Sequence, residues 1–103
     1  MHVIARPIIH AFITQHADAR GPLEAWYKTA SAARWNDLVQ IRATYPHADA
    51  VGRLMVFNMG GGKFRLVARV IYASAARQGT VFIRHILTHA EYDKEQWKRD
   101  PWF

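Results

Sequence analysis

The spacing of apolar residues along the chain changes near residue 50, from helical in the first half to alternating in the second. Residues 2–5 predict a short strand, and Pro7 suits the first turn of a helix that runs to about residue 17. After residue 22, five apolar residues recur at the i, i+3, i+4, i+7 spacing of a helix face that packs on a core: Leu23, Trp26, Tyr27, Ala30 and Ala33. Asn36 and Asp37 are suitable caps for a brief third helix that ends before Pro46.

The second half of the chain predicts strands at about residues 53–58, 64–72 and 80–87. Thr88 and Glu91 have the spacing of a capping box, which predicts a short final helix to about Trp97. The expected fold class is therefore α+β, with an N-terminal strand and helices packed on one face of a small curved antiparallel sheet and a short C-terminal helix. A chain of 103 residues fits one domain with one core, over residues 1–103.

Alternation assigns the side chains of the later strands to two faces of the sheet. The even positions of residues 64–72 are all apolar and are expected to face the helices. The odd positions are expected to form an open, partly basic face: Lys63, Arg65, Val67, Arg69 and Ile71. In the next strand the residues expected to face the core are Val81, Ile83 and Leu87, with His85 between them. The residues expected on the open side are Phe82, Arg84 and Ile86.

Charge is segregated along the chain, whose formal net charge is +6. No acidic residue occurs between Asp49 and Glu91, while that interval holds six cations: Arg53, Lys63, Arg65, Arg69, Arg77 and Arg84. A segregated positive field attracts polyanions, so nucleic acid is the first candidate partner and an acidic protein the second. The absence of cysteine excludes disulfides and thiolate metal sites and is typical of the cytoplasm. No apolar run is long enough to predict a membrane helix.

The glycines at 60–62 raise the question of a phosphate-binding loop. Phe57 stands where a Walker motif requires its first glycine, and Phe64 where it requires the magnesium-binding hydroxyl. The sequence is therefore no P-loop, and a hairpin turn that needs positive φ explains the glycines.

His89 and Tyr92 lie three residues apart at the start of the predicted last helix, and so on one side of it. Because this helix starts where the basic strand ends, an imidazole and a phenol are expected beside Arg84. In the alternative interpretation, Thr88 and Glu91 matter only as a cap, and Tyr92 packs its ring on the sheet. The tail 97-WKRDPWF-103 is either a frayed terminus or a segment that docks on a partner.

Metal ligation is not indicated by the sequence. The histidines show no HExxH or comparable spacing, and no carboxylate cluster occurs in residues 50–90. We therefore expect no metal and no cofactor, and a metal-dependent nuclease is disfavoured.

Two segments, 57-FNMGGGKFRLVARVIY-72 and 81-VFIRHILTHAEYDK-94, together resemble the HigB family of bacterial toxins within the RelE-like superfamily. The N-terminal MHVI and the GPLEAWYK helix resemble the same family, so the similarity extends over nearly the whole chain. One departure is the connection ASAARQGT, which is longer than is usual in the family. The resemblance implies a RelE-like fold and an mRNA interferase, an endoribonuclease that cuts messages on translating ribosomes. It also implies a HigA-type helix-turn-helix antitoxin as partner.

Cleavage of RNA without a metal suggests a role for each candidate residue. Arg65 and Arg84 are expected to bind the scissile phosphate, and Lys63 to hold a flanking phosphate or to assist proton transfer. His89 is the candidate acid or base, and Tyr92 is expected to stack on a base or position the 2′-hydroxyl. The further RNA-binding candidates are Arg53 and Arg69. The competing hypothesis is a non-catalytic basic module that binds RNA or protein and cleaves nothing.

Overall fold

The protein is described by a computed structural model that covers residues 1–5 and 7–103. Its centre is a five-stranded sheet with the strand order β1-β5-β4-β3-β2. The strands are β1 (His2–Ile4), β2 (Asp49–Val51), β3 (Leu54–Met59), β4 (Phe64–Ile71) and β5 (Thr80–Thr88). The three predicted central strands are antiparallel, whereas β1 pairs in parallel with β5, so the sheet is mixed. The α+β class is thus confirmed, and β2, which is too short to show alternation, is an additional strand.

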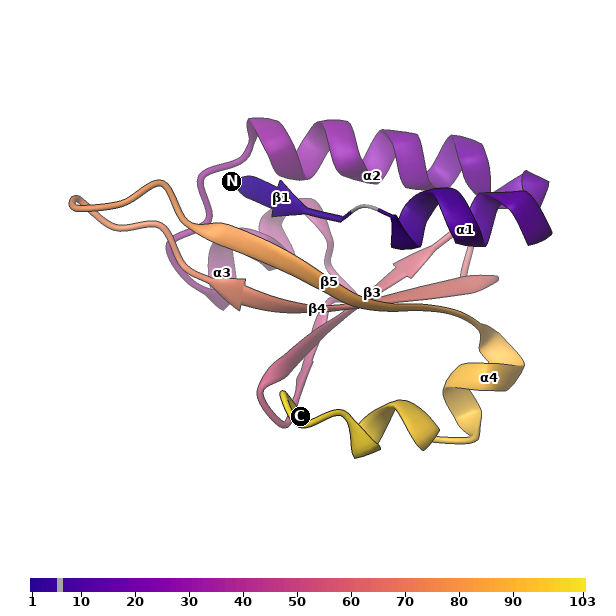
Figure 1. Cartoon of the computed structure of the whole chain (residues 1–103). Coiled ribbons are helices and arrows are strands. Elements are labelled where there is room, and N and C mark those ends of the chain that lie inside the picture. Colours follow the sequence, from indigo (N-terminus) through magenta and orange to yellow (C-terminus); the bar gives the residue numbers. More distant parts are fainter. Residues whose placement is uncertain (6) are drawn as a thin grey trace.

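Three helices cover one face of this sheet, as predicted (Figure 1). They are α1 (Ile8–Gln15), α2 (Arg20–Ala32) and α3 (Leu38–Thr44), with a 3₁₀ turn η1 (Ala17–Ala19) between the first two. Leu23, Trp26 and Ala30 of α2 are buried, and the Trp26 ring packs edge-on against Phe57 of β3, with 5.5 Å between centroids. Tyr27, predicted to lie in the core, is 39% exposed, because the buried stripe of α2 is narrower than the full apolar pattern.

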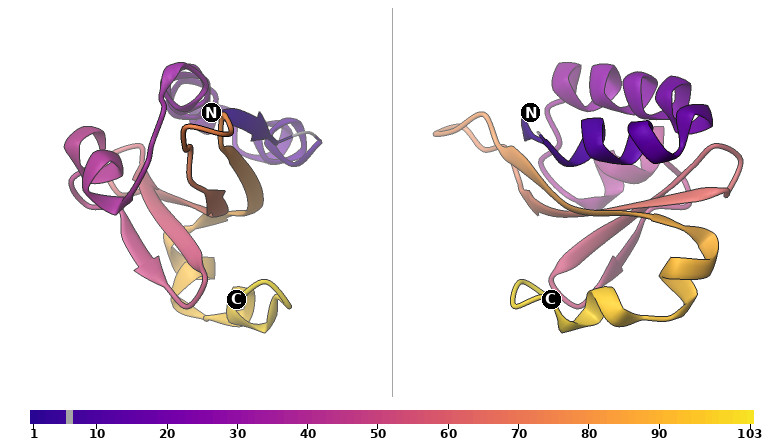
Figure 2. Two further views of the ribbon diagram at one scale, coloured as in Figure 1. Left: turned by 90° about the vertical axis from the view of Figure 1, so that its left-hand side faces the viewer. Right: turned by 45° about the vertical axis from the view of Figure 1, so that its right-hand side comes forward.

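The opposite face of the sheet is covered by the C-terminal segment, as the two views of Figure 2 show. This segment comprises α4 (His89–Asp93), a 3₁₀ turn η2 (Gln96–Arg99) and residues 100–103. The buried Trp97 packs with Leu54, Val56 and Val67 of the sheet. The prediction of an open face is therefore wrong. The tail is not a frayed terminus, because it docks on the protein's own sheet. The final helix is also shorter than predicted, because Glu95 adopts a left-handed conformation (φ 61°) that turns the chain before Trp97.

A β-bulge in β5 changes which side chains face the helices. Val67 of β4 pairs with His85, but the next residue, Ala68, pairs with Ile83, so Arg84 is an extra residue in β5. One inserted residue reverses the alternation beyond it. Ile86 therefore packs in the helix-side core and Leu87 on the C-terminal side, the reverse of the prediction. His85, predicted among the core-facing residues, likewise lies on the C-terminal side.

The β3–β4 turn lies where the three consecutive glycines predicted it. Gly60, Gly61 and Gly62 all have positive φ, as expected for the β3–β4 hairpin. The long β4–β5 connection projects from the body of the molecule and is closed by a bridge between Ser74 and Arg77 (Figure 1). In residues 1–5 and 7–103, no helix combines the length and the apolar character needed to cross a membrane.

Candidate functional site

The bulge in β5 and the C-terminal segment form a polar cluster around Asp100. Arg84 donates from Nε and Nη2 to the two carboxylate oxygens of Asp100, both at 2.9 Å. His85 Nε2 lies 2.8 Å from Asp100 Oδ2, and the Trp102 backbone N–H donates to Oδ1 at 2.8 Å. The guanidinium of Arg84 stacks over the Trp102 ring at 4.0 Å. Asp100 thus holds two adjacent side chains of β5 in fixed positions.

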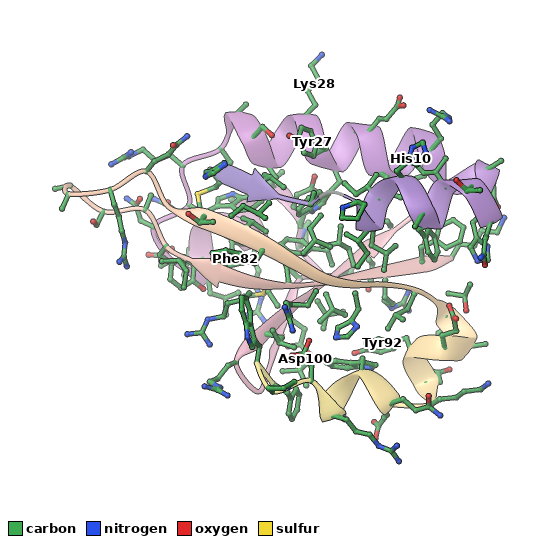
Figure 3. All side chains as sticks on the ribbon, viewed as in Figure 1. His10, Tyr27, Lys28, Phe82, Tyr92 and Asp100 are labelled. Carbon is green, nitrogen blue, oxygen red and sulfur yellow. The ribbon has the colours of Figure 1, made fainter. Side chains whose placement is uncertain are left out.

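Asp100 is ionised because its oxygens are surrounded by donors. Its side chain is only 2% exposed, and burial alone would disfavour the charge. The hydrogen bonds from Arg84 outweigh that effect and, with those from Trp102 and His85, lower the pKa of Asp100 to about 2. The carboxylate therefore acts as an acceptor at neutral pH. Figure 3 shows Asp100 on the side of the sheet opposite the long helices, the same side as Tyr92.

A second group of candidate residues lies where β4 meets α4. Arg65 Nη1 donates to the backbone oxygen of Gly62 at 2.6 Å, and its guanidinium carbon lies 5.5 Å from the centroid of the Tyr92 ring. Tyr92 in turn stacks on Trp97, with 5.2 Å between centroids. The expectation that Tyr92 sits beside Arg84 is therefore wrong: its cationic neighbour is Arg65, whereas the aromatic neighbour of Arg84 is Trp102.

His89 follows the last residue of β5, at the first turn of α4. The capping box at Thr88 is present as predicted and fixes this turn. The backbone N–H of His89 donates to the Lys63 backbone oxygen at 3.2 Å, which joins α4 to the start of β4. The His89 ring is 59% exposed, with Nε2 3.3 Å from Asp93 Oδ2. The Lys63 ammonium forms an exposed ion pair with Asp18.

Arg53 and Arg69 line a separate shallow cavity of about 270 Å³, together with Phe82 and Trp102. Arg53 also binds the chain end, donating from Nη2 to the Pro101 oxygen at 2.9 Å. This cavity adjoins the Arg84 cluster through Trp102. The candidate cations thus lie in three places: the α4 junction, the bulge and this cavity.

No set of three or more His, Asp or Glu side chains is arranged to hold a metal ion in the part of the chain that the structure describes.

Comparison with known proteins identifies the family of this chain. The model of the family HigB_toxin, described as the RelE-like toxic component of a toxin–antitoxin system, matches residues 19–95. The chain belongs to this family. It is 28% identical over 96 residues to the "mRNA interferase toxin HigB" of Escherichia coli K12, covering 90% of this chain and 88% of that protein. An "mRNA interferase HigB" of Escherichia coli CFT073 is 23% identical over 97 residues, covering 91% and 90%.

All seven residues singled out from the sequence of this HigB-family toxin lie inside the matched range, whereas Asp100 and Trp102 lie beyond it. Sequence reasoning missed these two residues because a short tail carries no periodicity from which its docking can be read. It also assigned His85 to the core, since strict alternation cannot reveal a bulge. The one available signal was Asp100 itself, the single acidic residue in a tail with three aromatic residues, Trp97, Trp102 and Phe103.

Proposed function

We propose that this toxin is an endoribonuclease that cleaves mRNA on translating ribosomes, without a metal ion, and so inhibits translation and growth. The observation that carries the proposal is the contact between the Arg65 guanidinium and the Tyr92 ring at the junction of β4 and α4, the short helix that also carries His89. Family membership and the mRNA interferase names of its relatives support it. A HigA-type helix-turn-helix antitoxin is the proposed partner, and the cytoplasm is the proposed location.

The reaction requires three kinds of group. A base removes the proton of the 2′-hydroxyl, cations stabilise the phosphorane, and an acid protonates the leaving 5′-oxygen. A positioned acid or base typically contributes ~10²–10⁴-fold. Removing one donor that stabilises the developing charge typically costs ~10²–10³-fold in turnover.

Arg65, at the α4 junction, and Arg84, at the bulge, lie in separate places on the C-terminal side of the sheet, and a scissile phosphate bound between them is proposed to contact both. The Gly62 and Phe64 carbonyl groups and the Tyr92 ring hold the Arg65 guanidinium in place without neutralising it. Within residues 7–103, the side-chain hydrogen bonds of Arg84 use Nε and Nη2, and the side chain is 31% exposed. Its Nη1 group therefore supplies the proposed contact with a phosphate oxygen.

His89 and Tyr92 are proposed to act beside that phosphate. The exposed His89 ring takes or gives a proton, and Tyr92 positions the 2′-hydroxyl or stacks on a base. Lys63 binds a flanking phosphate. Its pair with Asp18 is exposed, and such pairs are weak, so a phosphate can displace the carboxylate.

Arg53 and Arg69 are proposed to contact RNA further from the cleavage point. Contacts of this kind are electrostatic, so RNA affinity should fall as salt rises. Their cavity includes the Trp102 and Phe82 rings, which suits a neighbouring base.

The test is cleavage of a defined mRNA in a reconstituted translation reaction, with 5′ ends mapped and with oxygen or sulfur at a non-bridging position of the scissile phosphate. Wild-type protein should cut the unmodified message, and added Mn²⁺ should not restore the rate on the sulfur-substituted one. Arg65→Ala should fold normally and cut ~10²–10³-fold more slowly. Lys28→Ala is the matched control, because Lys28 points away from the sheet on the far side of α2 (Figure 3).

Two outcomes would contradict the proposal. Wild-type protein that binds RNA but leaves the message intact would indicate the non-catalytic binding module. A slow rate on the sulfur-substituted message that Mn²⁺ restores would exclude the metal-free mechanism, because it would show a metal ion bound to the scissile phosphate.

A further inference from the structure

We infer that His85 is the general base that takes the 2′-hydroxyl proton, and that Asp100 is the residue that positions it. This inference rests on the proposed endoribonuclease function and names a proton acceptor for that reaction. It assigns a chemical role to the C-terminal tail, which lies beyond the residues matched by the family model.

The first argument concerns the tautomer of His85. Its Nε2 lies 2.8 Å from Asp100 Oδ2. Asp100 already accepts hydrogen bonds from Arg84 and from the Trp102 backbone, and its low pKa keeps it ionised. An ionised carboxylate offers no proton, so Nε2 must be the donor of this bond. In the neutral imidazole the lone pair is then on Nδ1, the nitrogen that can accept a proton.

The second argument concerns access. His85 is 27% exposed, although its carboxylate partner is almost fully buried. The ring lines a cavity of about 350 Å³ between the end of β5 and the C-terminal segment. Lys94 also lines this cavity and supplies a cation for a phosphate; Glu91 is held in the capping box by the Thr88 N–H. A titratable side chain that is anchored on one nitrogen and open to a cavity has the arrangement of an acid–base residue.

The third argument concerns position. Arg84 and His85 are consecutive in the sequence, and the bulge leaves both side chains on the side of the sheet that carries Asp100. The same carboxylate binds both side chains, so the proposed phosphate ligand and the proposed base are held as one unit. β-Bulges commonly re-aim side chains next to active sites.

The chemical step balances without any further reactant. The 2′-O–H proton moves to Nδ1 of His85, and the 2′-oxygen attacks phosphorus. The bond from phosphorus to the 5′-oxygen breaks, and that oxygen takes a proton from a second group, for which His89 is available. The products are a 2′,3′-cyclic phosphate and a 5′-hydroxyl, and the protons return through solvent.

The test compares His85→Gln with wild type in single-turnover cleavage. The glutamine amide can donate to Asp100 as the imidazole does but cannot take the proton. His85→Gln should bind RNA within about twofold of wild type and cleave ~10²–10⁴-fold more slowly. His10→Gln, on the helix side of the molecule, is the matched control and should cleave normally (Figure 3).

Two further measurements separate a chemical role from a structural one. Added imidazole should restore cleavage to His85→Gly, a rescue that a purely structural histidine would not show. On a substrate with a 5′-bridging sulfur, whose leaving group needs no proton, His85→Gln should stay slow. Full recovery on that substrate would overturn the inference, since His85 would then be the acid.

Asp100→Asn tests the positioning residue. It should cleave more slowly while binding RNA at least as tightly as wild type, because the charge that fixes the tautomer is gone. Faster cleavage would overturn the inference and show that the carboxylate only blocks the phosphate site. Cleavage by folded His85→Gln at the wild-type rate would also overturn it, with the endoribonuclease function intact. If the wild-type protein cuts no RNA, both the endoribonuclease function and the role of His85 are excluded.

Discussion

Asp100 holds two basic side chains of β5, Arg84 and His85, in fixed positions. Arg84 and His85 are neighbours in the sequence, and a bare Arg–His pair on one face would repel when the imidazole is protonated. The buried carboxylate between them removes that cost and fixes both side chains. A single-residue insertion in β5 makes this arrangement possible, because it leaves two consecutive side chains on the same side of the sheet.

The low pKa of Asp100 predicts how the stability of the protein depends on pH. Its folded-state pKa is about 2 and its ordinary value is 3.8, so the carboxylate contributes stability that is complete above about pH 4. That contribution, about 2 kcal/mol, should be lost as pH falls from about 4 to 2. The measurement is urea unfolding at a series of pH values. Asp100→Asn should be less stable at neutral pH, and its stability should change less over that interval; an unchanged acid dependence would contradict the assignment.

At the scale of elements, the turn between β5 and α4 sets the positions of His89 and Tyr92. Thr88 Oγ1 accepts from the Glu91 N–H, and Glu91 accepts in return from the Thr88 N–H at 2.9 Å. A helix of five residues has little stability of its own, so this cap and the packing of Tyr92 on Trp97 hold α4 in place.

Removing the cap should therefore loosen the proposed site. Thr88→Ala is expected to lower the free energy of unfolding by about 1 kcal/mol, since the hydroxyl acceptor is lost. Thr88→Ser keeps the hydroxyl and is the control, with stability close to wild type. Chemical denaturation measures both variants. Equal stability of the two variants would mean that α4 is held by packing alone.

At the scale of the whole molecule, the sheet is enclosed by layers from opposite ends of the chain (Figure 2). The helices of residues 8–44 cover one face, and residues 89–103 cover the other. The chain end is fixed by Arg53, whose backbone N–H donates to the Phe103 oxygen at 2.8 Å. Gly52 allows this approach: a Cβ there would lie 2.8 Å from that oxygen and 2.9 Å from the Phe103 ring.

Docking of the tail can be tested with two glycines that share a left-handed backbone. Gly52→Ala and Gly61→Ala should both cost roughly 1–2 kcal/mol in backbone strain, since φ is +60° and +67°. Only Gly52→Ala adds a clash with Phe103; around Gly61 the described atoms leave the space open. We expect Gly52→Ala to be the less stable variant and to lose its C-terminal residues to carboxypeptidase faster. Equal rates would show that the tail is not held at Gly52.

The sequence by itself determined the α+β class, the helix face at Leu23 and Trp26, the glycine hairpin and the cap at Thr88. These features arise from interactions between residues close in the chain, so periodicity and local hydrogen bonding reveal them. Only the tertiary structure decided which cations stay unpaired. Asp18 pairs with Lys63, and Asp100 with Arg84, across separations of 45 and 16 residues. The positive stretch that looked unopposed in the sequence is thus partly neutralised from both ends of the chain, because a charge pair depends on distance in space.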